Sequence, residues 1–198
     1  MSEVVTMKDK KLAGKSCRYI HPTVMFIVTC IMICLPSLRA SAASEASWLK
    51  GVPLKQAIRI GNGTQVVIEI SDPDCPFSRR MVSYWNMRKD VSRYVFLIAL
   101  KNHPDAAQKA RYILCAADRA AAHHEVYSGE LDFGEKEFDR DCNDRGLLEL
   151  HRKVAATLDV SSTPTYYIKG IKINGAKVGE IEQILGGETY PFDATDSE

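Results

Sequence analysis

The fold is decided by the stretch Q-V-V-I-E-I-S-D-P-D-C-P-F-S-R-R at residues 65–80. Its run V-V-I-E-I is nearly continuous in β-branched residues, which is typical of a central strand buried on both faces of a sheet. The residues D-P-D at 72–74 end the strand. Pro76 then suits the first turn of a helix, because its fixed φ is helical and its missing N–H has no partner there. Apolar residues recur on one side of the segment that follows, so we expect this helix to pack against the sheet.

Outward from this stretch, strands and helices alternate. Residues 93–100 (R-Y-V-F-L-I-A-L) predict a second buried strand, which makes strand, helix and strand a parallel βαβ unit. The patterning predicts five further elements: a helical segment at 105–127, a helix from about 145 to 158, a short strand at 165–169, a partner strand around 171–173 and a helix at 178–185. The sequence therefore predicts the α/β class.

Length and charge indicate one globular domain with short extensions. The chain has 198 residues, of which 45% are hydrophobic and 26% are charged. The formal net charge is +1, but residues 1–42 hold six Lys or Arg and only two acids, which leaves −3 for the remainder. Such a body has no basic surface for nucleic acid. We expect the domain over residues 43–187 and a disordered acidic tail over 188–198.

The first 42 residues have the pattern of an export signal. A basic stretch precedes the apolar run Val24–Leu35, and the small residues A-S-A-A follow at 40–43. This order predicts a signal peptide cleaved after Ala42. The alternative is an uncleaved anchor, because Arg39 is unusual so near a cleavage site; the apolar run is, however, shorter than the roughly 20 residues that a span needs. Either way we expect the body to lie outside the cytoplasm.

Removal of the signal leaves three cysteines, Cys75, Cys115 and Cys142. Three thiols in an oxidising compartment indicate one disulfide and one odd cysteine, without showing which is odd.

Cys75 has the surroundings of a reactive thiol. It follows a buried strand and precedes the first turn of a helix, where unpaired N–H groups and the positive end of the helix dipole favour a thiolate. Arg79 and Arg80, about one turn further on, add attraction, whereas Asp72 and Asp74 oppose it. The alternative is an inert, buried cysteine. The polar, proline-punctuated sequence around Cys75 favours an accessible and reactive one.

Here the residues resemble a known family. The run G-N-G-T-Q-V-V-I-E-I-S-D-P-D-C-P-F-S-R-R at 61–80 resembles the active-site segment of periplasmic thiol:disulfide isomerases of the DsbC/DsbG type. In that family a strand ends in D-x-x-C-x-x-C and the first cysteine attacks. R-Y-I-L-C-A-A-D-R-A at 111–120 resembles the family's helix with a structural cysteine, and S-S-T-P-T at 161–165 resembles its loop with a cis proline. The resemblance spans about residues 54–186.

This resemblance implies a thioredoxin-like fold, with a central mixed sheet and a helical insertion. It implies that Cys75 is the nucleophile and that Cys115 and Cys142 form a structural disulfide. It also implies that Pro164 is cis and leaves the backbone of Thr163 free to pair with an extended substrate segment. An ordinary trans proline at the start of an edge strand is the alternative for Pro164.

Glu69 lies six residues before Cys75, where thioredoxin-like proteins often carry a buried acid. If it is buried and unpaired, its carboxyl can relay protons. If it faces outward on an edge, it has no such role. The residues favour neither position.

Two departures from the family shape the functional hypothesis. Ser78 stands where the family has its second, resolving cysteine, and the N-terminal dimerisation domain is missing. Ser78 cannot resolve a mixed disulfide, although its hydroxyl can donate a hydrogen bond to the Cys75 thiolate. We therefore predict a monothiol exchange protein that isomerises or reduces protein disulfides, with an external thiol as a possible reductant. The alternative is a non-enzymatic, chaperone-like or assembly module that has lost redox turnover.

No cofactor is implied. The histidines share no spacing that indicates a metal site, and His123 and His124 are expected to be solvated residues of a helix.

Overall fold

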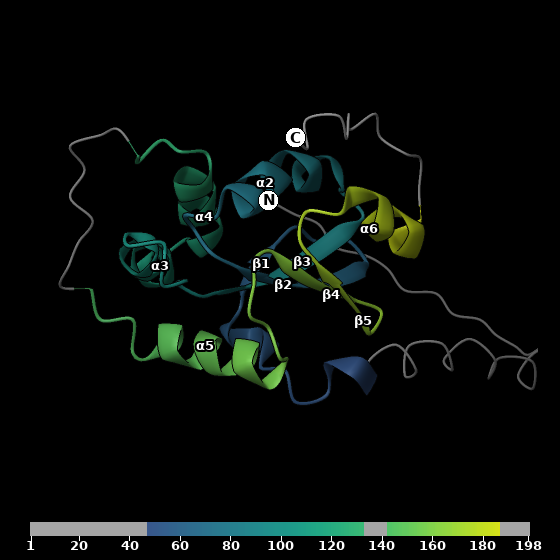
Figure 1. Ribbon diagram of the computed structural model, residues 1–198, viewed down its shortest axis with the longest axis horizontal. Coiled ribbons are helices and arrows are strands. Elements are labelled where there is room, and N and C mark those ends of the chain that lie inside the picture. The colour runs from purple at the N-terminus through teal and green to yellow at the C-terminus, as the bar shows by residue number, and fades with distance from the viewer. Residues whose placement is uncertain (1–46, 133–141, 187–198) are drawn as a thin grey trace, which may run out of the picture. The chain divides into compact units, whose positions relative to one another are not determined.

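The computed structural model describes residues 47–132 and 142–186, so the predicted signal at 1–42 and the acidic tail at 188–198 lie outside the described residues. Within the described residues, five strands form one mixed sheet with the order β1-β3-β2-β4-β5 (Figure 1). The strands are β1 (Ile58–Ile60), β2 (Gln65–Ser71), β3 (Val91–Leu97), β4 (Thr165–Ile168) and β5 (Ile171–Asn174). The neighbours β2 and β3 are parallel, and the other pairs are antiparallel. The predicted α/β class with a central mixed sheet is confirmed.

Helices cover both faces of this sheet. They are α2 (Pro76–Met87), α3 (Ala106–Cys115), α4 (Arg119–Tyr127), α5 (Leu147–Thr157) and α6 (Val178–Leu185), with short 3-10 turns η1 (Ser47–Leu49) and η2 (Leu54–Gln56). In Figure 1, α2 and α6 lie on one side of the strands and α5 lies on the other. The helix of the predicted βαβ unit, α2, begins at Pro76 as expected.

The segment 105–127 is two helices rather than one continuous helical stretch. The break falls at residues 116–118, between α3 and α4. Asp118 causes it, because its carboxylate accepts hydrogen bonds from the backbone N–H groups of Ala120 and Ala121, 3.0 Å each, and so caps a new helix. This allows α4 to turn back and pack against α3.

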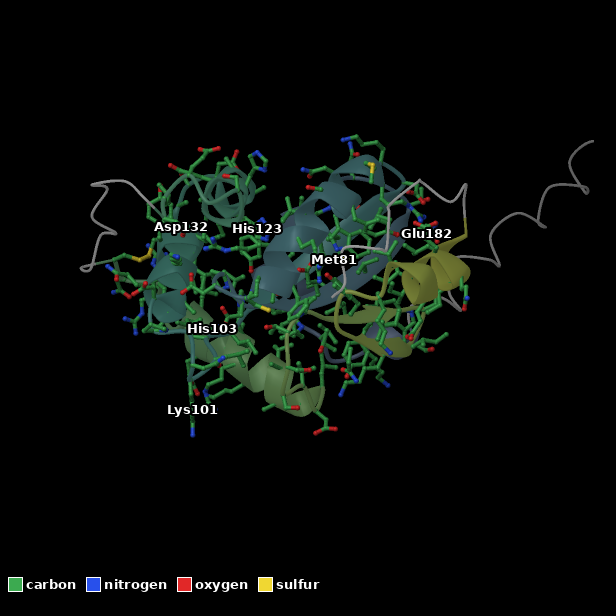
Figure 2. All side chains as sticks on the ribbon, turned by 45° about the horizontal axis from the view of Figure 1, so that its top comes forward. Met81, Lys101, His103, His123, Asp132 and Glu182 are labelled. Atoms are coloured by element: carbon green, nitrogen blue, oxygen red, sulfur yellow. A yellow bond between two sulfur atoms is a disulfide. The ribbon has the colours of Figure 1, made fainter. Side chains whose placement is uncertain are left out.

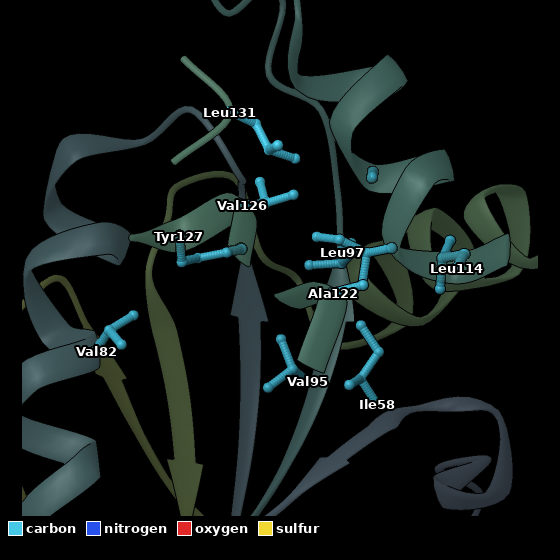
Figure 3. Packing of buried hydrophobic residues seen from close by; sticks show 11 residues of the cluster. Ile58, Val82, Val95, Leu97, Leu114, Ala122, Val126, Tyr127 and Leu131 are labelled. Atoms are coloured by element: carbon cyan, nitrogen blue, oxygen red, sulfur yellow. The ribbon is translucent and has the colours of Figure 1, made fainter. Parts of the chain in front are cut away.

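The central position of β2 explains why all of its residues from Val67 to Ser71 are buried. Val67 packs against α2, whereas Ile68 and Ile70 point to the opposite face and pack with α5. A third cluster joins the β1–β3 side of the sheet to α3 and α4, as Figure 3 shows. Its buried members are Ile58, Val82, Val95, Leu97, Ala110, Ile113, Leu114, Ala122, Val126, Tyr127 and Leu131. Within the described ranges, no helix is long and apolar enough to cross a membrane.

His151 fastens α5 to the sheet. The backbone N–H of Leu97 donates to His151 Nδ1 at 2.9 Å, so Nδ1 is unprotonated and the proton lies on Nε2, which is 3.0 Å from the carbonyl oxygen of Gln56. The ring is fully buried and meets the ring of Phe96 edge-on, with centroids 5.0 Å apart. Burial lowers the pKa of His151, which keeps the imidazole neutral.

Cys115, the last residue of α3, and Cys142 form a disulfide with their Cα atoms 6.2 Å apart. The structure thus contains the pairing that the family resemblance implied. The two residues are 27 apart in sequence and enclose α4.

Replacing both cysteines by alanine should lower the free energy of unfolding by about 3–4 kcal/mol, because the open chain regains loop entropy in the unfolded state. Urea titrations of wild type and Cys115→Ala/Cys142→Ala, each with and without reductant, measure this difference. Reductant should destabilise the wild type and leave the double variant unchanged. A double variant as stable as the oxidised wild type would contradict the prediction.

Candidate functional site

The loop that carries Cys75 is held by the buried side chain of Asp72. One carboxylate oxygen accepts the backbone N–H of Asp74 at 2.8 Å, and the other accepts the N–H of Leu100 at 2.7 Å, just beyond β3. The second oxygen also lies 3.0 Å from Nδ1 of His103. In addition, the N–H of Cys75 donates to the carbonyl of Asp72 at 3.1 Å. Asp72 therefore fixes the turn between β2 and α2 and places Cys75 at the N-cap of α2.

Cys75 faces the loop before β4. Its Sγ donates to the carbonyl oxygen of Thr163 at 3.2 Å, across 88 positions of sequence. The Thr163–Pro164 peptide bond is cis. The structure thus brings together the three residues that the resemblance placed at one site. The sequence predicts an accessible thiol, and this prediction is wrong for the structure, since Cys75 is only 4% exposed. The Thr163 segment covers it, a long-range contact that local polarity does not reveal.

Ser78 lies three residues beyond Cys75, in the first turn of α2. It is buried rather than exposed, at 1% of its surface. Its Oγ has no hydrogen-bond partner among the described residues, and neither has Oγ1 of Thr163, which is 8% exposed. Ser78 lies near Cys75 in sequence, and the carbonyl of Thr163 contacts its Sγ. Within the described part of the chain, each of these two residues therefore carries a hydroxyl group without a hydrogen-bond partner. A buried hydroxyl without a partner is costly unless a charged or polar group meets it in another state.

Arg79 does not direct its charge to Cys75. Its guanidinium forms ion pairs with Asp74 and Asp132, and Lys109 of α3 pairs with the same two carboxylates. Figure 2 labels Asp132, in the segment after α4. Hydrogen bonds from Arg79 hold the pKa of Asp132 at about 2. The pKa of Lys109 is raised above its usual value. Burial by itself would lower this pKa, but the hydrogen bonds to Asp132 and Asp74 together have the larger effect. Sequence inspection missed Lys109 and Asp132, because nothing in the sequence shows that they meet the active-site turn.

The sequence left open whether Glu69 is buried or faces outward, and in the structure it is buried. It is 1% exposed, and its Oε2 accepts a hydrogen bond from Nη1 of Arg93 at 2.7 Å. The carboxyl is therefore paired, which removes the condition under which a proton relay was expected. Arg93 is the third site residue that the sequence did not reveal, since it lies in a strand, β3, whose other residues are mostly apolar.

Comparison with solved structures supplies the family. No protein-family model matches the chain, and a search of curated proteins finds no match. A disulfide interchange protein from Neisseria gonorrhoeae is 30% identical, with a TM-score of 0.55; the match covers 67% of this chain and 94% of that one. This chain belongs to the disulfide interchange protein family.

Two solved structures of lower sequence identity share the fold of this chain. ScsC of Proteus mirabilis is 14% identical with a TM-score of 0.53, covering 83% of this chain and 89% of that chain. The thiol-disulfide exchange protein alpha-DsbA2 from Wolbachia pipientis is also 14% identical, with a TM-score of 0.54, covering 71% and 91%. The predicted thioredoxin-like fold is thus confirmed. The narrower resemblance to the DsbC/DsbG type stays a prediction.

His123 of this chain is not the solvated residue expected from the sequence. It is 2% exposed and stacks on Tyr127, with ring centroids 3.9 Å apart. Figure 2 shows it between α4 and α2. Burial, followed by the nearby charges of Arg93 and His124, holds the pKa of His123 well below its usual range. The apolar neighbours Ala122 and Val126 carry the signal that was overlooked, because they mark the buried side of α4. His124 is exposed, as expected. In the described part of the chain, no cluster of acidic, histidine and cysteine side chains is arranged to hold a metal.

Proposed function

We propose that this protein performs thiol–disulfide exchange through Cys75 alone, as a monothiol isomerase or reductase of protein disulfides in the periplasm. One observation carries the proposal. Cys75 is the free cysteine of the described residues, the other two are bridged to each other, and Ser78 occupies the fourth position of the C-P-F-S motif. The disulfide interchange protein from Neisseria gonorrhoeae supports exchange as the general activity.

The exchange needs no second thiol in the motif. The Cys75 thiol gives its proton to a base in solvent, and the thiolate attacks one sulfur of a substrate disulfide. That S–S bond breaks, a mixed disulfide forms, and the other substrate sulfur leaves as a thiolate. If a thiolate of the substrate then attacks the mixed disulfide, Cys75 is released and the substrate is isomerised without net redox change. If two molecules of an external thiol react in turn, they leave as their own disulfide and the substrate is reduced.

Ser78 and Thr163 have supporting roles in this scheme. In the thiol form, Cys75 donates to the carbonyl of Thr163. A thiolate has no proton to donate and needs donors instead, and the hydroxyls of Ser78 and Thr163 are free to supply them. When a substrate displaces the thiol contact, the backbone of Thr163 is available for an extended segment of substrate chain, next to Pro164.

The decisive test is to restore a second cysteine. Two cysteines three residues apart at the start of a helix are close enough to form a disulfide. In the Ser78→Cys variant, the new thiol should therefore attack the mixed disulfide at Cys75 and release the substrate. We expect the lifetime of its adduct with a disulfide-bonded peptide to be at least about tenfold shorter than that of the wild-type adduct. Mass spectrometry with peptide mapping follows the adduct at Cys75.

Ser78→Ala is the matched control, because it changes the same buried position without adding a thiol. Its adduct should persist like that of wild type. Equal lifetimes for wild type and Ser78→Cys would contradict the monothiol mechanism.

A binding module without turnover is the second candidate, and the burial of Cys75 favours it. Such a protein would keep reduced, unfolded chains from aggregating, and Cys75→Ser would do so equally well. A native protein that forms no Cys75 adduct but has this activity would establish the second candidate and overturn the first.

A further inference from the structure

Four charged side chains form a cluster at the turn that carries Cys75. Each of the two cations, Arg79 of α2 and Lys109 of α3, contacts both carboxylates, Asp74 and Asp132. Nη2 of Arg79 lies 3.3 Å from Oδ1 of Asp74, and Nζ of Lys109 lies 2.7 Å from Oδ1 of Asp132. The Lys109 side chain is 8% exposed and the other three are 16–23% exposed, so the cluster is largely shielded from water.

The cluster adjoins Cys75 through the main chain. Asp74 directly precedes Cys75 in sequence. The backbone N–H of Arg79 donates to the carbonyl oxygen of Cys75 at 3.0 Å, and Nε of Arg79 donates to the carbonyl oxygen of Pro73. Arg79 therefore binds the main chain on both sides of Asp74. Because Coulomb energy falls with distance, a charge imbalance in this cluster acts on the nearby sulfur.

A turn after α4 brings Asp132, which Figure 2 labels, to the cluster. Its backbone N–H donates to the carbonyl oxygen of Gly129 at 3.1 Å, and Gly129 has a φ of +84°, which favours glycine. A Cβ atom at residue 129 would also lie 3.3 Å from Oδ2 of Asp132 and 4.0 Å from Nη1 of Arg79. Gly129 thus permits the turn and leaves room for the ion pair.

The four charges of the cluster cancel. Hydrogen bonds from Arg79 hold the pKa of Asp132 at about 2, and the bonds of Lys109 to Asp132 and Asp74 raise its pKa despite burial. Asp132 and Lys109 are therefore both charged at neutral pH. With two cations and two carboxylates, the cluster has no net charge beside Cys75.

Three further titratable or charged groups belong to this region. Asp72 is buried within the turn, and its carboxylate lies 3.0 Å from Nδ1 of His103. The guanidinium of Arg80 lies 5.1 Å from the ring centre of Phe77. These groups are the same whether or not Lys109 or Asp132 is substituted. Their effect on the sulfur therefore cancels when such variants are compared with wild type.

We propose that Lys109 and Asp132 are positioning residues that balance the charge of the Cys75 turn and thereby set how readily the thiol becomes a thiolate. The carboxylate of Asp74 by itself opposes a thiolate, and the guanidinium of Arg79 by itself favours one. Lys109 adds the second cation from α3, and Asp132 adds the second anion from the segment after α4. This inference rests on the proposed function and deepens it, because the thiolate is the species that attacks a disulfide.

Single substitutions that unbalance the cluster test the proposal. Lys109→Met leaves a net negative charge, so the midpoint of thiolate formation at Cys75 should rise by about 0.5 pH unit. Asp132→Asn leaves a net positive charge and should lower the midpoint by about the same amount. Ultraviolet absorbance of the thiolate measures each midpoint, as the difference between each protein and its Cys75→Ser counterpart. Below the midpoint, Asp132→Asn should also react about twofold faster with a disulfide-bonded peptide, because a larger thiolate fraction outweighs weaker nucleophilicity.

Opposite signs distinguish charge balance from a structural role. Both substitutions break ion pairs of the cluster, so a merely structural role predicts shifts in the same direction. Lys109→Met/Asp132→Asn restores a neutral cluster and should return the midpoint to that of wild type. Salt at about 1 M should shrink both single shifts. Glu149→Gln is the matched control, because it breaks an exposed ion pair on α5 with Arg152 and should leave the midpoint unchanged.

The titration and the exchange assay separate the two levels of inference. If wild type forms no Cys75 adduct with the peptide, the proposed function fails, while the titration still reports on the cluster. If wild type forms the adduct but the two single variants shift the midpoint in the same direction, or by less than about 0.2 pH unit, the function stands and the role of Lys109 and Asp132 is overturned. If Lys109→Met does not fold, the midpoint of Asp132→Asn decides, because the Asp132 side chain is the most exposed of the four.

Discussion

Replacing Cys75 with serine should lower the rate of disulfide exchange by at least about a thousandfold, to the level of the reaction without protein. A serine hydroxyl in the same position cannot form a mixed disulfide, and the other cysteines of the described residues are bridged. Incubation with a disulfide-bonded peptide, followed by peptide mapping, should show the adduct on Cys75 in wild type and none at residue 75 in the variant.

The fold should survive this change. Serine is nearly isosteric with cysteine, and its hydroxyl can still donate to the carbonyl of Thr163, so the expected loss of stability is about 1 kcal/mol or less. Cys115→Ala/Cys142→Ala is the matched control, because it removes two cysteines yet should keep full exchange at Cys75. Peptide maps of wild type in which Cys75 is bridged to Cys115 or Cys142 would refute the assignment of the reactive thiol.

Most elements of the fold were predictable because each has a local cause, but the short edge strand β1 was not predicted. The β-branched run fixes β2, Pro76 starts α2, and the periodicity of residues 178–185 matches α6. The break between α3 and α4 was missed, although Asp118 is a typical N-cap residue, because helical spacing continues across it.

The site was predictable only in part, for a physical reason. Cys75, Thr163 and Pro164 were found from short motifs. Long-range contacts decide the rest. The Thr163 loop buries Cys75, and Arg93, a whole helix beyond β2, neutralises Glu69. Both depend on strand order and register, which local pattern does not determine.

The largest change in stability is expected from His151→Ala, which should lower the free energy of unfolding by about 3–5 kcal/mol. The change leaves the N–H of Leu97 and the carbonyl of Gln56 without their partner and opens a cavity beside Phe96. His124→Ala is the matched control on an exposed histidine and should cost less than about 0.5 kcal/mol. Urea titrations at pH 7.5 measure both.

The same residue should make the protein sensitive to mild acid. The pKa of His151 is lower in the folded protein than its ordinary value of 6.5, and that of His123 is well below it, so the unfolded chain binds more protons as the pH falls. Stability contributed by these two residues is present above pH 6.5 and is lost as the pH falls below about 6.5, by up to about 1.4 kcal/mol per pH unit for each histidine. His151→Ala should therefore show a smaller slope than wild type below pH 6.5, and His124→Ala the same slope as wild type. Equal slopes for wild type and His151→Ala would mean that the imidazole of His151 binds a proton in the folded protein, and the hydrogen bond from Leu97 to Nδ1 would then be wrong.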